Sequence, residues 1–193
     1  TRWWHTTSLP EVFGVQEADE NALYAAMDWL LERQGAIQKK LAARHLAEGG
    51  LALYDLSSSY FEGRCCPLAK IGYSRDGKRN TLQVNYGLLT TRAGCPVAIS
   101  VYEGNTADTS TLLPQVSQLR EDLGLKRVVL VGDRGMISHK AIDTLRSLDG
   151  LEWVTALKSS QIRTLVQGGA LQLDLFDERN LFEFSHPDYP GER

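Results

Sequence analysis

Two aspartates occupy positions from which a β-sheet could present carboxylates to a single ligand. Asp55 lies inside the apolar stretch LALYDLSSSYF (51–61), which is typical of a buried strand. A carboxylate in such a strand is costly unless it is paired or binds a metal. Asp133 directly follows the apolar run RVVLVG and so marks the carboxyl end of a second strand, where ligands gather in open α/β sheets. If the two strands are neighbours, the carboxylates lie close together.

Two adjacent carboxylates repel each other, and a divalent cation is the natural way to keep both ionised. Mg²⁺ takes one or two protein carboxylates, and two such ions about 4 Å apart support phosphodiester chemistry. Each aspartate also has a structural interpretation. Asp133 could be a turn or cap residue, and Asp55 could accept hydrogen bonds from Ser57 or Ser59 or pair with an arginine. The two together favour the metal interpretation.

Other chemistries find little support in the sequence. The four histidines are scattered without ligand spacing, and the three cysteines show no C-x-x-C pattern, which favours free thiols in a reducing cytoplasm over a zinc site or a disulfide framework. No G-x-G-x-x-G or P-loop pattern points to a nucleotide cofactor. No uncharged apolar stretch is long enough to predict a membrane span.

Charge is unevenly distributed along a chain whose net charge is −3. The window from Arg64 to Arg92 holds six basic residues and one acidic residue. Such a segment could face nucleic-acid phosphates. It could equally consist of edge-strand charges that block aggregation.

The apolar periodicity predicts the elements that must position the aspartates. A helical segment over 17–47, with a break at Gly35, has an apolar face that we expect to pack on a core: Leu23, Tyr24, Met27, Leu30 and Leu31. Strands are predicted over 51–61, 81–91, 95–104, 126–133 and 151–157, with helices over 107–124 and after Ser138. Three antiparallel strands that lead into parallel, helix-connected strands make a mixed sheet with helices on both faces. This is the layout of the ribonuclease H-like α/β fold, although the pattern alone also allows other α/β sheets.

The same pattern divides the chain into three parts. Residues 1–48 form an N-terminal helical segment, and residues 49–157 form the ribonuclease H-like core. From 158 to 193 the pattern weakens into short alternating stretches, which predict the start of a β-rich insertion.

The sequence resembles the DDE transposases of bacterial insertion sequences, in the branch whose insertion lies between the second Asp and the final Glu. The resemblance covers roughly residues 45–193 and is carried by LYDLSSSYFEG, GYSRDGKRN, GLLTTRAGCPVAISVYEGNTADTSTL and VVLVGDRGMIS. The motifs GNTAD and GDRGM, in this order, are its more specific part.

This resemblance implies that Asp55 and Asp133 are the first two catalytic acids and ligands of two Mg²⁺ (or Mn²⁺) ions. It implies DNA cleavage at transposon ends, followed by transfer of the freed 3′-hydroxyl to target DNA. The DNA contacts implied are Arg75, Lys78 and Arg79, together with Arg134, which contacts phosphate or orients Asp133. Asn105, Thr106 and Asp108 match a motif of structural or supporting character. A homodimer in the synaptic complex and a bacterial cytoplasmic location, at the nucleoid when DNA is bound, are also implied.

The sequence departs from the family in lacking the third acidic residue. That residue belongs to a later helix with a Tyr, an Arg and a Lys, and neither Glu178 nor Glu183 has this setting. We therefore expect a fragment of a transposase, inactive alone. Two other possibilities are a non-catalytic remnant that binds only DNA or a partner, and a ribonuclease H-like nuclease outside transposition.

Overall fold

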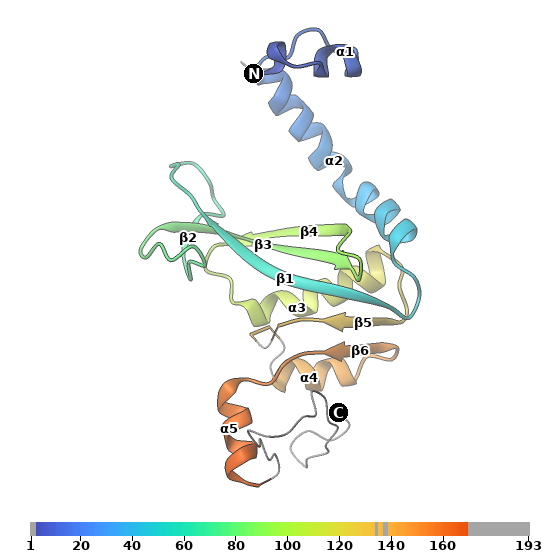
Figure 1. Cartoon of the computed structure of the whole chain (residues 1–193), viewed down its shortest axis with the longest axis vertical. Coiled ribbons are helices and arrows are strands. Elements are labelled where there is room, and N and C mark those ends of the chain that lie inside the picture. Colours follow the sequence, from blue (N-terminus) through green and yellow to red (C-terminus); the bar gives the residue numbers. More distant parts are fainter. Residues whose placement is uncertain (1–2, 134, 137–138, 170–193) are drawn as a thin grey trace, which may run out of the picture.

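A computed structural model of the chain describes residues 3–133, 135–136 and 139–169. Its centre is a sheet of six strands: β1 Gly50–Tyr60, β2 Lys70–Ile71, β3 Leu82–Thr91, β4 Pro96–Glu103, β5 Val128–Val131 and β6 Leu151–Val154 (Figure 1).

Strand β1 occupies the middle of this sheet and joins its two halves. On one side it pairs antiparallel with β3, which pairs antiparallel with β4 and, beyond the end of β4, with the short β2. On the other side it pairs in parallel with β5, which pairs in parallel with β6. The ribonuclease H-like mixed sheet predicted from the sequence is thus confirmed.

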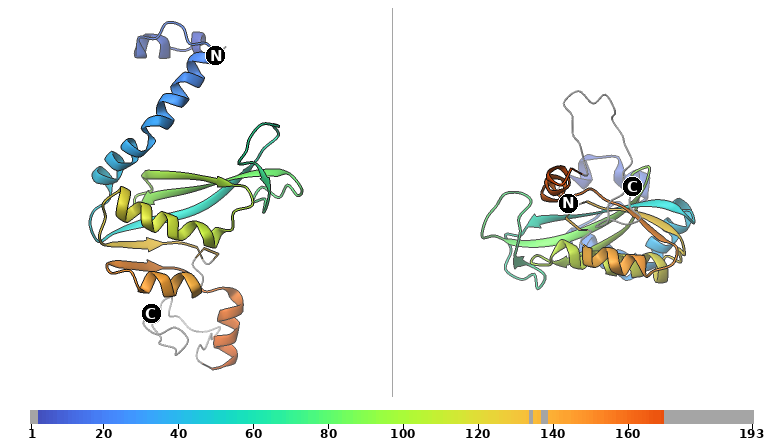
Figure 2. Two further views of the ribbon diagram at one scale, coloured as in Figure 1. Left: turned by 180° about the vertical axis from the view of Figure 1, so that it is seen from behind. Right: turned by 90° about the horizontal axis from the view of Figure 1, so that it is seen from below.

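The two crossover helices lie on the same face of the sheet. Helix α3 (Asp108–Ser117), its π-helical continuation η2 (Gln118–Asp122) and α4 (His139–Arg146) bury the side of β1 that carries Ala52, Tyr54 and Leu56 (Figure 2). The predicted flanking helices are thus present, and α5 (Ser159–Gln167) lies on the other side of the sheet from α3 and α4 (Figure 2). Two successive right-handed crossovers that advance in the same direction across a sheet put both of their helices on one face.

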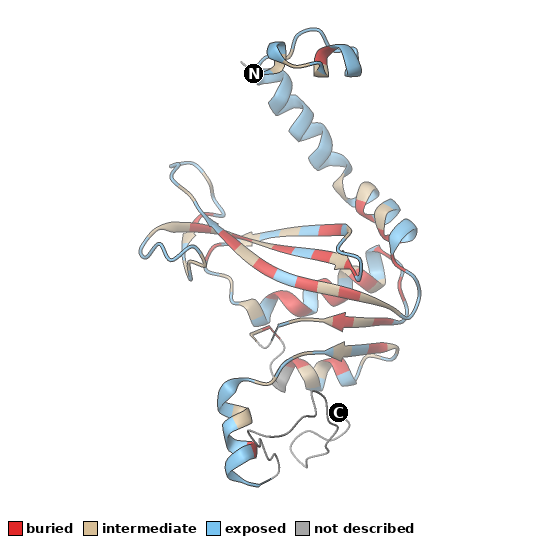
Figure 3. Cartoon of the chain, in the orientation of Figure 1, coloured by how far each residue is buried: buried red, intermediate tan, exposed pale blue. Residues whose placement is uncertain are grey.

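The opposite face of the sheet is open. Leu88, Ile99, Val101 and Val154 point out of it with exposed side chains, in contrast to the buried or partly buried residues that alternate with them (Figure 3). This exposed face carries the candidate site described below.

Before the sheet lie a 3-10 turn, η1 (Trp4–Thr6), a short helix, α1 (Leu9–Phe13), and the long helix α2 (Glu20–His45). Asp19 caps α2 by accepting a hydrogen bond from the backbone N–H of Ala22 at 2.7 Å. The helix runs through Gly35, where a break is expected, because a single interior glycine costs only about 1 kcal/mol relative to alanine. No helix in the described part of the chain is long and apolar enough to cross a membrane.

The amino-terminal half of α2 projects away from the body (Figure 1). The apolar face expected to pack on a core is exposed, from 44% at Leu23 to 68% at Leu31. Amphipathic spacing identifies the apolar side of a helix, but it does not show whether anything covers that side.

The carboxyl-terminal half of α2 packs on the outer edge of the sheet. Gln38 and Ala42 are buried there. The side-chain amides of Gln34 and Gln38 both donate to the backbone carbonyl of Ile99 in β4, at 2.9 and 3.0 Å. This half of the helix is therefore part of the core, although the sequence places residues 1–48 in a separate segment.

Helix α5 (Ser159–Gln167) follows β6. Residues 159–167, which the sequence assigns to the start of a β-rich insertion, are thus helical. The alternating stretches that suggest that insertion, and both Glu178 and Glu183, lie outside the described residues.

Candidate active site

Asp55 projects from the open face of β1. Its neighbours Tyr54 and Leu56 point into the core, so strand alternation turns Asp55 to the other side, where its side chain is exposed. One carboxylate oxygen accepts a hydrogen bond from the backbone N–H of Leu56 at 2.9 Å. The sequence predicts burial for Asp55, and this is wrong because helices cover only one side of the strand. Water can solvate the carboxylate, and its presence in the strand carries little desolvation cost.

Asp133 lies two residues beyond the end of β5, where the chain turns back toward α4. Its Oδ1 accepts hydrogen bonds from the backbone N–H groups of Gly135 at 2.7 Å and Met136 at 3.0 Å. Met136 is buried and anchors the turn in the core. The aspartate therefore has the turn role allowed by the sequence, while its Oδ2 receives no hydrogen bond from the described residues.

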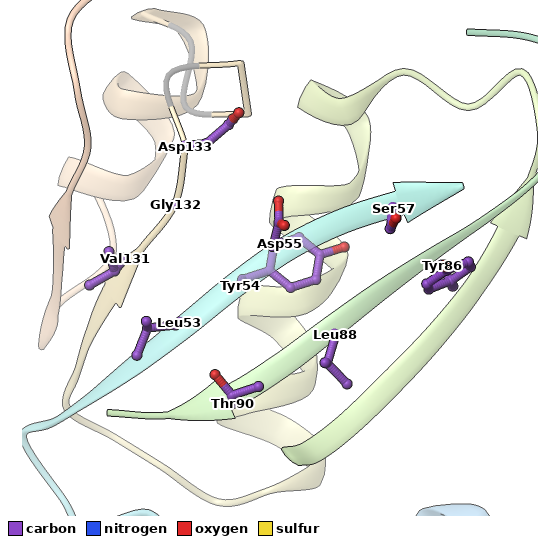
Figure 4. Close-up of a pocket in the computed structure, with 10 residues that line it drawn as sticks. All are labelled: Leu53, Tyr54, Asp55, Ser57, Tyr86, Leu88, Thr90, Val131, Gly132 and Asp133. Atoms are coloured by element: carbon purple, nitrogen blue, oxygen red, sulfur yellow. The ribbon is translucent and has the colours of Figure 1, made fainter. Parts of the chain in front are cut away.

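The two aspartates lie at the same level of neighbouring strands. In the parallel pairing of β1 with β5, Leu53 is opposite Val131. Asp55 and Asp133 each follow two residues later, Asp55 within β1 and Asp133 beyond the end of β5. Figure 4 shows Asp55 within β1 and Asp133 in the turn that follows β5. Both aspartates line one cavity, and the close approach of their carboxylates stays a prediction.

A shallow cavity of about 630 Å³ runs along the open face beside the aspartates. Its lining is mostly apolar and comes from β1, β3 and the end of β5: Leu53, Tyr54, Asp55, Ser57, Tyr86, Leu88, Thr90, Val131, Gly132 and Asp133 (Figure 4). A ligand in this cavity would contact both carboxylates at one end and apolar side chains along the rest.

Tyr86 is a residue of this site that the sequence did not single out. It is the cross-strand partner of Ser57, on the same face as Asp55. Hydrogen bonds with the hydroxyls of Ser57 and Ser59 hold the pKa of the Tyr86 phenol below its usual value. The period-2 pattern of residues 81–91 could have placed Tyr86 beside Asp55 once the antiparallel register with β1 was known.

The two aspartates could supply some, but not all, of the protein ligands of a divalent cation. Two exposed carboxylates at one level supply the protein ligands that Mg²⁺ commonly takes, with water and substrate phosphate oxygens as its remaining ligands. Within the described ranges, no group of three or more His, Cys, Asp or Glu side chains could hold a metal ion. The third acidic residue that the resemblance implies is therefore not found among the described residues.

Three of the residues predicted to contact DNA lie in the loop of residues 72–81, which we call the basic loop, and their surroundings differ. Lys78 and Arg79 are exposed, and the Lys78 ammonium lies 3.5 Å from the centroid of the Tyr60 ring. Arg75 is only partly exposed and pairs with Asp108, with 2.7 Å between the guanidinium and the carboxylate. Arg134 lies outside the described residues.

Comparison with known families gives one match. The model of the family described as "Transposase DDE domain" matches residues 64–181, more than half of the chain. Asp133 and the basic loop lie inside the matched range, whereas Asp55 precedes it by nine residues. No curated protein matches the chain.

Several solved structures show distant likeness. A piggyBac transposase synaptic complex with hairpin DNA aligns at 17% identity and a TM-score of 0.43, over 58% of this chain and 24% of that one. A Mos1 transposase paired-end complex with the left transposon end aligns at 12% identity and a TM-score of 0.38, over 72% of this chain and 55% of that one. A Mos1 mariner paired-end complex with Mn aligns at 13% identity and a TM-score of 0.35. The chain thus spans between about a quarter and about half of the length of these structures.

Proposed function

Because the chain belongs to the family of transposase DDE domains, we propose that it supplies two of the acidic residues with which a metal-dependent transposase cleaves DNA and transfers the cut strand. The chain is a transposase domain. The reaction, the metal and the roles of individual residues are our proposal.

One observation carries this proposal. Asp55 and Asp133 come from distant parts of the sequence, yet both line one cavity, and the parallel pairing of β1 with β5 supports their approach. Both side chains are exposed there, so an extended substrate can reach them. An isolated turn aspartate would not need a second carboxylate beside it.

Each of these residues has a separate role in the proposed reaction. Asp55 and Asp133 would hold Mg²⁺ or Mn²⁺, expected as two ions, which supplies charge stabilisation and activates the attacking oxygen in phosphodiester chemistry. The hydrogen bonds from Gly135 and Met136 fix one oxygen of Asp133 and leave the other for a ligand. Exposed Lys78 and Arg79 would contact backbone phosphates of the transposon end. The target DNA and a second copy of the protein in the synaptic complex are the further partners that we propose.

The test uses the full-length transposase and a supercoiled plasmid that carries the element's own ends. Cleavage and strand transfer are followed on gels with Mg²⁺ or Mn²⁺ present. Asp55→Asn and Asp133→Asn should each abolish both steps, because the amide keeps the shape of the carboxylate and removes its charge. Mn²⁺ binding, measured by electron paramagnetic resonance, should weaken in both variants. Mn²⁺ binding that is unchanged in both variants would contradict the metal role.

Asp122→Asn is the matched control. Asp122 is exposed in η2, before the start of β5 and away from the carboxyl ends of the strands. This variant should cleave like the unmodified protein. Undiminished cleavage by Asp55→Asn would refute the proposed function. Salt-dependent DNA binding without any cleavage in the unmodified protein would support the non-catalytic remnant instead.

A further inference from the structure

The two sequence motifs GYSRDGKRN and EGNTAD dock on each other through their backbones. A Cβ atom at Gly72 would collide with the carbonyl oxygen of Gly104, and one at Gly104 would collide with the carbonyl oxygen of Gln83 and lie 2.7 Å from that of Lys70. The backbone N–H of Gly104 also donates to the carbonyl of Leu68 at 3.0 Å. The start of the basic loop is therefore fixed against the segment that leads into α3.

An ion pair between side chains joins the same two segments. The Arg75 guanidinium lies 2.7 Å from the Asp108 carboxylate, and these side chains are only 22% and 38% exposed. Asp108 is the first residue of α3, where the helix dipole favours a negative charge. The backbone N–H of Arg75 donates to Ser58 Oγ at 3.3 Å, three residues after Asp55 on β1. Arg75 thus links the basic loop to α3 and to the strand that carries Asp55.

The tip of the basic loop depends on this anchor for its position. Gly77 has a φ of 72°, which lets the chain turn, and the backbone N–H of Lys78 donates to Ser74 Oγ at 3.1 Å. Lys78 then lies over the Tyr60 ring at the end of β1, and Arg79 follows with an exposed side chain. Figures 1 and 2 show the segment between β1 and β3 at the end of the sheet where β1 finishes.

We propose that Arg75 is a positioning residue: through Asp108 it holds the basic loop so that Lys78 and Arg79, and not Arg75 itself, meet the DNA phosphates. The proposal rests on the proposed function, because it assumes that DNA passes this end of the sheet. It replaces the direct DNA contact that the sequence predicts for Arg75. A guanidinium already bound to a carboxylate has fewer donors to offer a phosphate.

The salt dependence of DNA binding separates the two roles. Each phosphate contact with duplex DNA contributes about 0.9 to the slope of log affinity against log salt concentration. In the full-length protein, Lys78→Gln and Arg79→Gln should each reduce this slope by about one contact. Arg75→Gln should reduce the slope as well and lower the cleavage rate by roughly tenfold, because the released loop no longer holds Lys78 and Arg79 at the phosphates. Asp108→Asn should reduce the slope too only if Arg75 acts through Asp108, because a direct phosphate contact by Arg75 would not need that carboxylate.

Asp108→Asn provides the sharper comparison. Removal of a negative charge should strengthen binding to DNA if Asp108 acts only through the general field. A positioning role predicts instead that Asp108→Asn lowers the cleavage rate about as much as Arg75→Gln does. The double variant should be no worse than either single variant, because both remove the same contact. The exchanged pair Arg75→Asp with Asp108→Arg should recover part of the rate.

A second readout requires no DNA. Trypsin should cut after Lys78 and Arg79 faster in Arg75→Gln and Asp108→Asn than in the unmodified protein, while the global thermal midpoint shows that both variants fold. An unchanged salt slope, or unchanged cleavage and proteolysis, in Asp108→Asn would overturn the proposal. If the unmodified protein neither binds nor cleaves DNA, the proposed function fails, and faster proteolysis of the two variants would still identify the anchor of the loop.

Discussion

Tyr54, the neighbour of Asp55 in β1, lies beneath the candidate site in a small polar network. Burial raises the pKa of its phenol, and its hydroxyl lies 3.5 Å from that of Tyr102. Gln115 in α3 donates to Tyr102 at 3.0 Å and to Ser100 Oγ at 2.7 Å. The inner side of β1 is thus fixed by hydrogen bonds to the sheet and by α3, which gives Asp55 a rigid base.

Gly87 makes room for the Tyr54 ring, and this leads to a prediction. A Cβ atom at residue 87 would collide with the Tyr54 hydroxyl and come within 2.7 Å of its ring carbons. Gly87→Ala should therefore lower the free energy of unfolding by about 1–3 kcal/mol through overpacking. Urea denaturation measures the change.

Gly35→Ala is the matched control for this experiment. Nothing lies within 4 Å of a Cβ atom at Gly35, which is exposed inside α2. Here alanine should raise the free energy of unfolding by about 0.5–1 kcal/mol through its better helix propensity. Equal effects at the two glycines would contradict the packing that we describe around Tyr54.

At the scale of elements, Glu48 joins the α2–β1 connection to the start of β5. Its two carboxylate oxygens accept hydrogen bonds from the backbone N–H groups of Lys126 at 2.9 Å and Arg127 at 2.8 Å. These bonds hold the pKa of Glu48 below its usual value of 4.5. Because the pKa is lower in the folded state, the stabilisation is present above that usual value and is lost as pH falls through the folded-state pKa.

Glu48→Gln should therefore lower the thermal midpoint at pH 7. It should also reduce the loss of stability on acidification, since the remaining amide does not titrate. Thermal unfolding followed by circular dichroism between pH 7 and pH 3 measures both effects. Glu62→Gln, at an exposed residue just after β1, should behave like the unmodified protein. A variant of Glu48 that keeps the full acid sensitivity would show that other carboxylates are responsible.

Local sequence patterns predicted where the helices and strands lie better than they predicted which of their faces are buried. Alternation in 51–61 and 81–91 gave β1 and β3 to within one residue, and the apolar run before Asp133 gave β5. The assumed pairing of the strand of Asp55 with the strand before Asp133 is also present. Exposure of Asp55 and of the α2 face could not be predicted, because periodicity does not reveal which surfaces another element covers. The Arg75–Asp108 pair depends on the docking of two loops, and no spacing rule connects these residues.

At the scale of the molecule, the charge of the chain is not spread evenly. The chain carries a net charge of −3, yet Lys78 and Arg79 stand exposed in the basic loop, with Lys78 over Tyr60 at the end of β1. Under the proposed function, attraction of DNA would come from this loop. The open sheet face exposes apolar side chains, including Leu88 and Ile99. The acids and the apolar cavity share this face, whereas the basic loop contacts β1 at Tyr60.

The two glutamine amides of α2 that bind the Ile99 carbonyl have a consequence for the behaviour of the protein in solution. They occupy the free side of β4, which would otherwise offer unpaired backbone groups to another strand. Without residues 1–48 the chain should form oligomers of increasing mass, which light scattering detects. The double variant Gln34→Ala with Gln38→Ala should form them more weakly, because the helix still covers the edge of the sheet. A monodisperse shortened chain would contradict this expectation. Helix α2 thus protects the edge strand β4 from pairing with another copy of the chain. A shortened protein that begins after residue 48 would lose this protection.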